Sequence, residues 1–298
     1  MNLTLHTDPD PAIRARLFAM LDRYNDEASQ RPEPVRHLTI PLRDAAGAIE
    51  GGLVGISYYD WLLVEMLFVP QALRGHGIGR QLMRAAEAVA ADRGCIGVWL
   101  DTGSPDARQF YRRLGYGDFA ALPDHPAGYT RHFMSRLAPR PGSTGALAIT
   151  EARDPLAAAV IGRGLNDVAD GLFGPETGRE ALAITADDES GKSLGGLWML
   201  VRRDWLFLDL FILGPEARGS GTGRRILAMA EDLARAHGCT GVWLDSFGFQ
   251  APGFYRAQGY APIGELPDYP APHARHFFAK RLDEDALGHA AKEGSASF

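Results

Sequence analysis

The chain has 298 residues, a net charge of −6 and 46% hydrophobic residues, as in an ordinary soluble globular protein. At roughly 150 residues per domain, this length indicates two domains. The acidic balance and the lack of a basic block exclude a typical nucleic-acid binder. No apolar run reaches the roughly 18–20 residues of a membrane span, and residues 1–10 lack the apolar stretch of a signal peptide. We therefore expect a cytoplasmic protein that binds neither nucleic acid nor membrane.

The elements of the first half follow from hydrophobic periodicity and turn residues. In chain order we predict a helix at 11–26, strands at 38–42, 52–59 and 62–69, a helix at 77–92, a strand at 96–100, a helix at 105–113, and strands at 116–122 and 130–137. This order predicts a mixed α/β sheet. Most of the sheet is expected to be antiparallel, with one parallel strand–helix–strand crossover around the second helix.

The second half repeats the first at an offset of 144 residues. Arg74–Gly79 returns as Arg218–Gly223, and Gly94–Asp101 returns as Gly238–Asp245. Solenoid units span only about 20–50 residues, so this repeat is a duplicated domain.

The repeat also sets the predicted boundaries. One domain spans residues 1–138 and a second, similar domain spans residues 147–282. Residues 139–146 are rich in Pro, Gly and Ser, which is typical of a linker. Residues 283–298 are polar and small, and we expect a disordered tail there.

We expect neither a disulfide nor a metal centre. Cys95 and Cys239 precede an apolar strand at matching positions, which favours small buried core residues. The histidine pairs near the end of each repeat lack a third ligand at suitable spacing, so no zinc site is predicted.

A glycine-rich segment links an apolar strand to a helix in each repeat, at Arg74–Gly79 and Arg218–Gly223. Glycines let backbone N–H groups converge, and the helix N-terminus adds positive potential, so the pattern favours a pyrophosphate. Neither copy has the lysine of a mononucleotide P-loop, and G-x-G-x-G differs from the dinucleotide G-x-G-x-x-G. The alternative is a glycine-rich turn with a structural role.

The motifs that surround this loop occur in the same order in both repeats. Gly-Gly-Leu opens an earlier strand at Gly51–Leu53 and Gly195–Leu197. Phe-Tyr-x-x-x-Gly-Tyr follows the loop at Phe110–Tyr116 and Phe254–Tyr260. With Arg-x-x-Gly-x-Gly between them, nearly all of each copy resembles the GNAT superfamily of acyl-CoA N-acyltransferases. The resemblance implies two tandem GNAT-like domains.

The resemblance also implies acetyl-CoA as co-substrate. The loop would hold the pyrophosphate, and the pantetheine arm would lie in a V-shaped gap beside a bulged strand. The implied contacts in the first repeat are Leu67, Phe68, Val69, Arg74, Gly75, His76, Gly77, Ile78, Gly79 and Arg80. In the second repeat they are Phe211, Ile212, Leu213, Arg218, Gly219, Ser220, Gly221, Thr222, Gly223 and Arg224.

One carboxylate interrupts the apolar strand before each loop. These residues are Glu65 and Asp209, and burying a carboxylate there is costly unless it is paired or faces a cleft. The resemblance implies a general base that takes the proton of the acceptor amine. The alternatives are a structural carboxylate or one that only binds the ammonium.

Tyr111 and Tyr255 match the family tyrosine near the coenzyme sulfur, which implies a general acid for the leaving thiolate. A backbone N–H near Leu67 and Phe211 would hold the oxyanion. The alternative for each tyrosine is packing.

The chain departs from the family at one coenzyme contact. The family's asparagine, seven residues before the tyrosine, is replaced by Ser104 and Gly248. Asp101–Thr102 and Asp245–Ser246 end the preceding strand, and they are candidates to make this coenzyme contact instead.

In this family the acceptor pocket is formed by the first helix and the loop before the last strand. The polar residues of that loop are His125, Tyr129, Arg131 and His132, and Tyr269, His273, Arg275 and His276. They are candidates to recognise a carboxylate or a ring, and the alternative for the arginines is pairing with a carboxylate. The first helices differ most, with Tyr24–Glu27 aligned to Val168–Gly171, so we expect the copies to differ in acceptor.

The sequence therefore predicts an acetyl-CoA-dependent N-acetyltransferase, as a monomer or homodimer, that modifies a small-molecule amine in a ternary complex. One alternative keeps one copy catalytic and the other structural or regulatory. The other is a non-enzymatic acyl-CoA sensor.

Overall fold

The computed structural model describes residues 1–142, 144–145, 147–176 and 179–282. The helices of the first repeat are α1 (Pro11–Ser29), the short 3-10 helix η1 (Gln71–Leu73), α2 (Ile78–Asp92) and α3 (Pro105–Arg113). Its strands are β1 (Asn2–His6), β2 (Arg36–Arg43), β3 (Ile49–Tyr58), β4 (Trp61–Phe68), β5 (Gly97–Thr102), β6 (Gly117–Pro123) and β7 (Thr130–Leu137). All predicted elements of this repeat are present; α3 and β7 have the predicted ends, the others have shifted ends, and β1 is an additional strand.

The described part of the second repeat has the same order of elements, but none of its strands corresponds to β1. Its helices are α4 (Pro155–Phe173), the 3-10 helix η2 (Pro215–Ala217), α5 (Thr222–Ala236) and α6 (Pro252–Ala257). Its strands are β8 (Glu180–Asp187), β9 (Ser193–Arg202), β10 (Trp205–Leu213), β11 (Gly241–Phe247), β12 (Ala261–Leu266) and β13 (Arg275–Arg281). The predicted tail at 283–298 lies outside the described residues.

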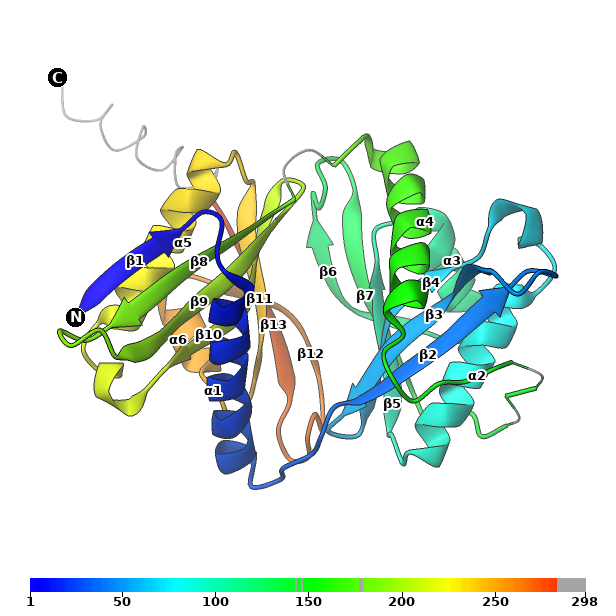
Figure 1. The fold of residues 1–298 in the computed structure, drawn as a ribbon, viewed down its shortest axis with the longest axis horizontal. Coiled ribbons are helices and arrows are strands. Elements are labelled where there is room, and N and C mark those ends of the chain that lie inside the picture. Colours follow the sequence, from blue (N-terminus) through cyan, green and yellow to red (C-terminus); the bar gives the residue numbers. More distant parts are fainter. Residues whose placement is uncertain (143, 146, 177–178, 283–298) are drawn as a thin grey trace, which may run out of the picture.

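One sheet runs through the described part of the chain in the order β1-β8-β9-β10-β11-β13-β12-β6-β7-β5-β4-β3-β2. The pairs β4–β5 and β10–β11 are parallel, and every other pair in this sheet is antiparallel. This arrangement confirms the predicted mixed α/β fold and its crossovers. We call β2, β3, β4, β5, β7 and β6 the first sheet half. The second sheet half consists of β1, β8, β9, β10, β11, β13 and β12 (Figure 1).

The first helix of each repeat packs on the sheet half of the other repeat. In Figure 1, the blue β1 and α1 lie with the yellow-green strands β8 to β10, and the green α4 lies with the blue strands β2 to β4. β1 pairs antiparallel with β8, and α1 contacts β9 and β10. α4 contacts β3 and β4, and Thr150 before it pairs with Thr39 of β2. The boundaries predicted from the repeat therefore do not coincide with the groups of elements that pack together.

The two exchanged helices begin in the same way. Each has an aspartate cap followed by a proline, with the Asp10 carboxylate accepting from the Ala12 N–H at 2.8 Å and Asp154 accepting from Leu156 at 2.9 Å. Each then buries one central apolar side chain, Leu17 or Ile161, against the sheet half of the other repeat. Periodicity identifies that apolar face but not the sheet that covers it.

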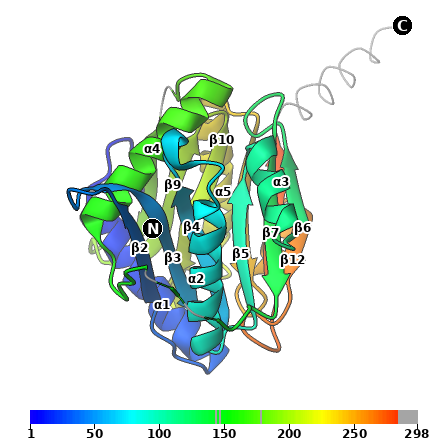
Figure 2. The ribbon, with the colours of Figure 1, turned by 90° about the vertical axis from the view of Figure 1, so that its right-hand side faces the viewer.

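The opposite face of each half is covered by the helix after the glycine loop. α2 packs with β2 to β5 around Leu82 and Met83, and α5 packs with β8 to β11 around Ile226 and Leu227. Figure 2 shows α2 and α4 on either side of the β3–β4 pair. The parallel pair of each half is therefore enclosed between a local helix and a helix from the other repeat.

The two halves join where β12 meets β6, at the antiparallel pair of Gly264 and Ala120. A Cβ atom on Gly264 would lie 2.4 Å from the Phe119 carbonyl oxygen, so the strands can approach closely only at a glycine. The Trp61 indole stacks on Tyr269 with 5.7 Å between the ring centroids. Residues of both repeats thus share one aromatic core at the join.

Candidate active site

The glycine loops have the geometry of an anion cradle. Gly75 and Gly77 have φ of +81° and +79°, and Cβ atoms built on them would meet no atom within 4 Å. In the second loop, Gly219 and Gly221 have φ of +72° and +81°, and a Cβ atom built on either would also meet no atom within 4 Å. These conformations strongly favour glycine, and they leave the start of α2 or α5 open to a ligand.

The rest of each loop is fixed by its own side chains. Arg74 Nε donates to the Val69 carbonyl at 3.0 Å, and Arg218 Nε donates to the Leu213 carbonyl at 2.8 Å. Ser220 Oγ donates to the Ala217 carbonyl at 2.8 Å. These bonds hold each loop against the end of the preceding strand.

Both parallel strand pairs separate near the same point, one residue later in the second repeat. The β4–β5 pairing ends at Leu63, although β4 continues to Phe68, and the β10–β11 pairing ends at Leu208. The neighbouring antiparallel ladders are interrupted next to these positions, at Glu65 and at Asp209. Each predicted carboxylate is therefore the extra residue of a β-bulge beside the splayed pair.

The two carboxylates have different surroundings. Asp209 Oδ2 accepts from Arg14 of α1, at 3.1 Å from Nε and 2.9 Å from Nη2. Glu65 is exposed and has no hydrogen bond or ion pair with any residue that the structure describes. Sequence reasoning missed Arg14, because nothing in its helix pattern shows that α1 packs on β10.

The two tyrosines are nearly buried on the local-helix side of the sheet. Tyr111 and Tyr255 are each 7% exposed and belong to the main core clusters. Burial, and to a smaller extent the charge of Asp101 or Asp245, raises the pKa of each phenol far above its usual value near 10. Both hydroxyl groups therefore keep their proton at neutral pH.

The carboxylates at the ends of β5 and β11 already hold guanidinium groups. Arg131 pairs with Asp101 at 2.5 Å, and Arg275 pairs with Asp245 at 2.8 Å. Pairing with a carboxylate, the alternative interpretation of these arginines, is therefore confirmed. Ser104 caps α3 by accepting from the Ala107 N–H at 3.3 Å.

Two last-loop candidates lie in the core between the halves rather than in an open pocket. Tyr269 is fully buried, and His125 stacks on Trp205 with 5.9 Å between centroids. Burial, helped by the charge of Arg131, lowers the pKa of His125 to about 2. The expectation that this loop recognises the acceptor is wrong for these two residues, because aromatic residues of the other repeat cover each of them.

A cavity of about 360 Å³ opens between α1 and the end of β10. Its polar lining residues are Arg23, Tyr24, Glu27 and Arg218. The Arg218 guanidinium lies 4.6 Å from the centre of the Tyr24 ring. The C-terminal part of α1 thus reaches the second glycine loop.

The matching place in the first half is tightly packed. There the Phe68 ring lies against Gly164 of α4, where a Cβ would come within 2.3 Å of the ring. In the second half, Met20 and Ile212 occupy these positions and both line the cavity. The two sites therefore differ on the side that faces the exchanged helix.

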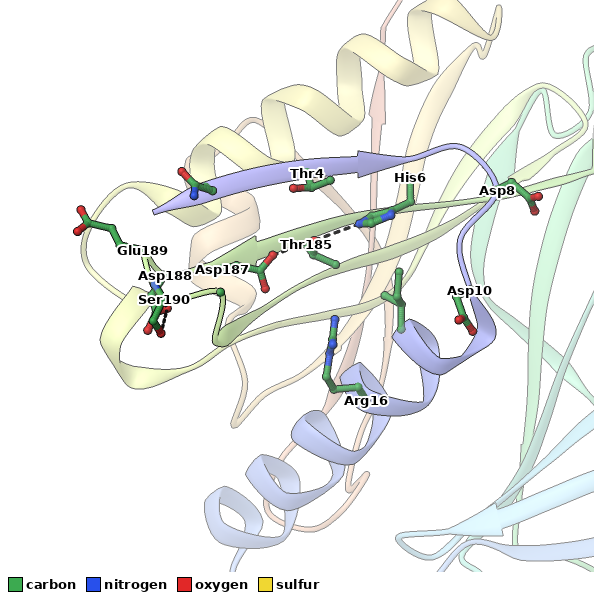
Figure 3. Close-up of a pocket in the computed structure, with 13 residues that line it drawn as sticks. Thr4, His6, Asp8, Asp10, Arg16, Thr185, Asp187, Asp188, Glu189 and Ser190 are labelled. Atoms are coloured by element: carbon green, nitrogen blue, oxygen red, sulfur yellow. Dashed lines mark hydrogen bonds between the residues drawn. The ribbon is translucent and has the colours of Figure 1, made fainter.

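A second cavity, of about 800 Å³, lies between β1, the start of α1 and the β8–β9 turn (Figure 3). Its acidic side chains include Asp10 and Asp188, whose carboxylates accept backbone N–H groups of their own turns. The His6 ring hydrogen-bonds to Thr185 at 3.1 Å. None of the predicted site residues lines this cavity.

Cys95 and Cys239 are buried and free, as predicted. Burial raises the pKa of each thiol to about 11, so both stay protonated at neutral pH. Within the described residues, no group of three or more His, Cys, Asp or Glu side chains is arranged to hold a metal ion. No described helix is long and apolar enough to cross a membrane.

The sequence model of the Acetyltransferase (GNAT) family matches residues 5–116 and 165–260, so the chain belongs to this family. Mycothiol acetyltransferase of Beutenbergia cavernae is 28% identical over 265 residues, covering 79% of this chain and 84% of that protein. Blasticidin-S acetyltransferase of Streptomyces morookaense is 41% identical over 104 residues, which cover 35% of this chain and 76% of that protein.

An acetyltransferase of Agrobacterium fabrum is 44% identical over 87 residues, which cover 29% of this chain; the match spans 64% of that protein. A solved acetyltransferase structure from Agrobacterium tumefaciens is 33% identical with a TM-score of 0.45. It covers 46% of this chain and 100% of its own chain.

Proposed function

We propose that the chain is an acetyl-CoA-dependent N-acetyltransferase with two coenzyme sites, in which a small-molecule amine attacks the thioester directly in a ternary complex. The observation that carries this proposal is a constellation found twice: a carboxylate on a bulge, a splayed parallel strand pair and an open glycine cradle at a helix N-terminus. Two relatives carry the small molecules blasticidin-S and mycothiol in their names, which supports a small acceptor.

The residues present fit this coenzyme. Glycines with open space above them leave room for a pyrophosphate close to the backbone N–H groups of each loop. Beyond Leu63 and Leu208 the parallel ladders stop, so the backbone of Leu67–Val69 and Phe211–Leu213 is available to bind the pantetheine arm. The coenzyme would supply an acetyl thioester, an acyl group already activated for transfer.

The protein's own groups then have three tasks. Glu65 and Asp209 accept the proton of the acceptor ammonium, directly or through water. The backbone N–H of Leu67 or Phe211 stabilises the oxyanion. Tyr111 or Tyr255, protonated because it is buried, gives its proton to the departing thiolate.

There are two alternatives to this proposal. In the first, one copy is catalytic and the other is structural or regulatory; the different surroundings of Glu65 and Asp209 favour it. A pure acyl-CoA sensor needs neither the carboxylate nor the tyrosine, so their presence in both repeats argues against it.

The test removes both phenol groups, because either site alone would sustain turnover. We expect the Tyr111→Phe, Tyr255→Phe double variant to lose at least about 100-fold in kcat and to bind acetyl-CoA as before. Tyr116→Phe is the control, since it removes a buried hydroxyl that bonds to Glu87. Full kcat in the double variant would contradict the acid role, and calorimetry with acetyl-CoA reports binding separately.

A further inference from the structure

The exchange of helices brings an arginine of the first repeat to the carboxylate of the second site. Arg14 on α1 donates from Nε and Nη2 to the same oxygen of Asp209, at 3.1 and 2.9 Å. The two side chains are 48% and 20% exposed, so a ligand can reach the pair. Among the described residues of the second repeat, none bonds to the Asp209 carboxylate through its side chain.

Each partner keeps unused hydrogen-bonding capacity. Among the described residues, nothing donates to Asp209 Oδ1, and Arg14 Nη1 donates to nothing. A guanidinium has five N–H donors in one plane, so Arg14 can hold a second carboxylate while it remains on Asp209. The pair therefore presents a negative oxygen and a positive donor side by side.

The first site lacks this arrangement. Ala158 of α4 stands at the position of Arg14, and Glu65 has no ion partner among the residues that the structure describes. The first site consequently has an uncompensated negative charge at the bulge, whereas the second has a carboxylate–guanidinium pair. An approaching ammonium meets attraction alone at the first bulge, and attraction together with repulsion at the second.

We propose that Arg14 is a specificity-determining residue that makes the second site select acceptors with a carboxylate next to the amine, while the first site accepts plain amines. This inference rests on the proposed acetyltransferase function. The acceptor's ammonium lies at Asp209 Oδ1 and its carboxylate lies at Arg14 Nη1, a charge-assisted pairing. An amine without the carboxylate gains no such bond and is repelled by the guanidinium.

The test compares tyrosine with tyramine, which differ only in that carboxylate. The ratio of their kcat/KM values is measured in Tyr111→Phe, which reports the second site, and in Tyr255→Phe, which reports the first. We expect Arg14→Ala to lower the tyrosine-to-tyramine ratio of the second site about tenfold, and Arg14→Lys to restore part of it. Ala158→Arg should raise the ratio at the first site.

Arg16→Ala is the matched control, because Arg16 has the same charge on the same helix and lines the other cavity. An unchanged ratio in Arg14→Ala, or an equal fall in Arg16→Ala, would overturn the inference. So would acetylation of neither probe by a chain that acetylates other amines. Failure of the proposed function looks different, since the chain would then acetylate no amine at all, whether or not acetyl-CoA binds in a calorimetric titration.

Discussion

At the scale of single residues, the glycines of the two loops combine a left-handed backbone conformation with the proposed coenzyme site. Gly75 and Gly77 adopt left-handed conformations, and any side chain there would project into open space. A substitution therefore adds two effects. It strains the backbone by about 1 kcal/mol, and it fills part of the cradle.

We expect Gly75→Ala and Gly77→Ala to weaken acetyl-CoA binding at the first site about tenfold while the fold is retained. Gly47→Ala is the matched control, because Gly47 also has a left-handed φ of +85° and open space but lies in a remote turn. Calorimetric titration of the three variants measures the effect. Equal losses of affinity in all three would show that strain alone, and not the cradle, explains the result.

The sequence shows which residues interrupt a pattern, but not which residues come near them. Glu65 and Asp209 are charged residues in apolar strands, and both lie on bulges at the separating strand pairs. Arg14 is one of several charged residues on an amphipathic helix, so no pattern distinguishes it. Its role depends on a contact made 195 residues away along the chain.

At the scale of elements, the exchange of α1 and α4 decides how each site is completed. Helix periodicity predicts both helices well, yet the same apolar stripe fits either of two similar sheets. Duplication makes the two sheet halves nearly interchangeable partners. The strand β1 was missed for a related reason. Three of its five residues are exposed and two are half-buried, and they form a strand only when β8 pairs with them.

We expect Leu17→Ala to disturb the second sheet half and Ile161→Ala to disturb the first. Each side chain is fully buried against strands of the other repeat, and each truncation should cost about 2–5 kcal/mol. Amide hydrogen exchange measures where the loss occurs. Leu17→Ala should accelerate exchange in β9 and β10 but not in β3 and β4, and the reverse pattern would contradict the exchange.

At the scale of the whole molecule, the two repeats share one continuous sheet and one aromatic core. Trp205 Nε1 donates to the Asp124 carbonyl at 2.6 Å, and Trp61 Nε1 donates to the Asp268 carbonyl at 3.2 Å. These matching bonds tie the last loop of each repeat to the other half. The sequence predicts these loops at the acceptor pocket, because sequence alone does not reveal an interface between the two repeats.

Duplication also explains why the sites differ. A pseudo-symmetric pair in a single chain allows one copy to change while the other is kept. The second site has a cavity beside Tyr24, whereas Phe68 fills the matching place against Gly164. Both halves nevertheless have the same glycine cradle and the same kind of splayed strand pair, so we expect both to bind the coenzyme.

The most direct test of two coenzyme sites is a calorimetric titration of the full chain with acetyl-CoA. We predict two molecules bound per chain, because both cradles and both strand gaps are present. Binding of one molecule per chain would contradict the claim of two coenzyme sites. Binding of none would contradict the proposed acetyltransferase function itself.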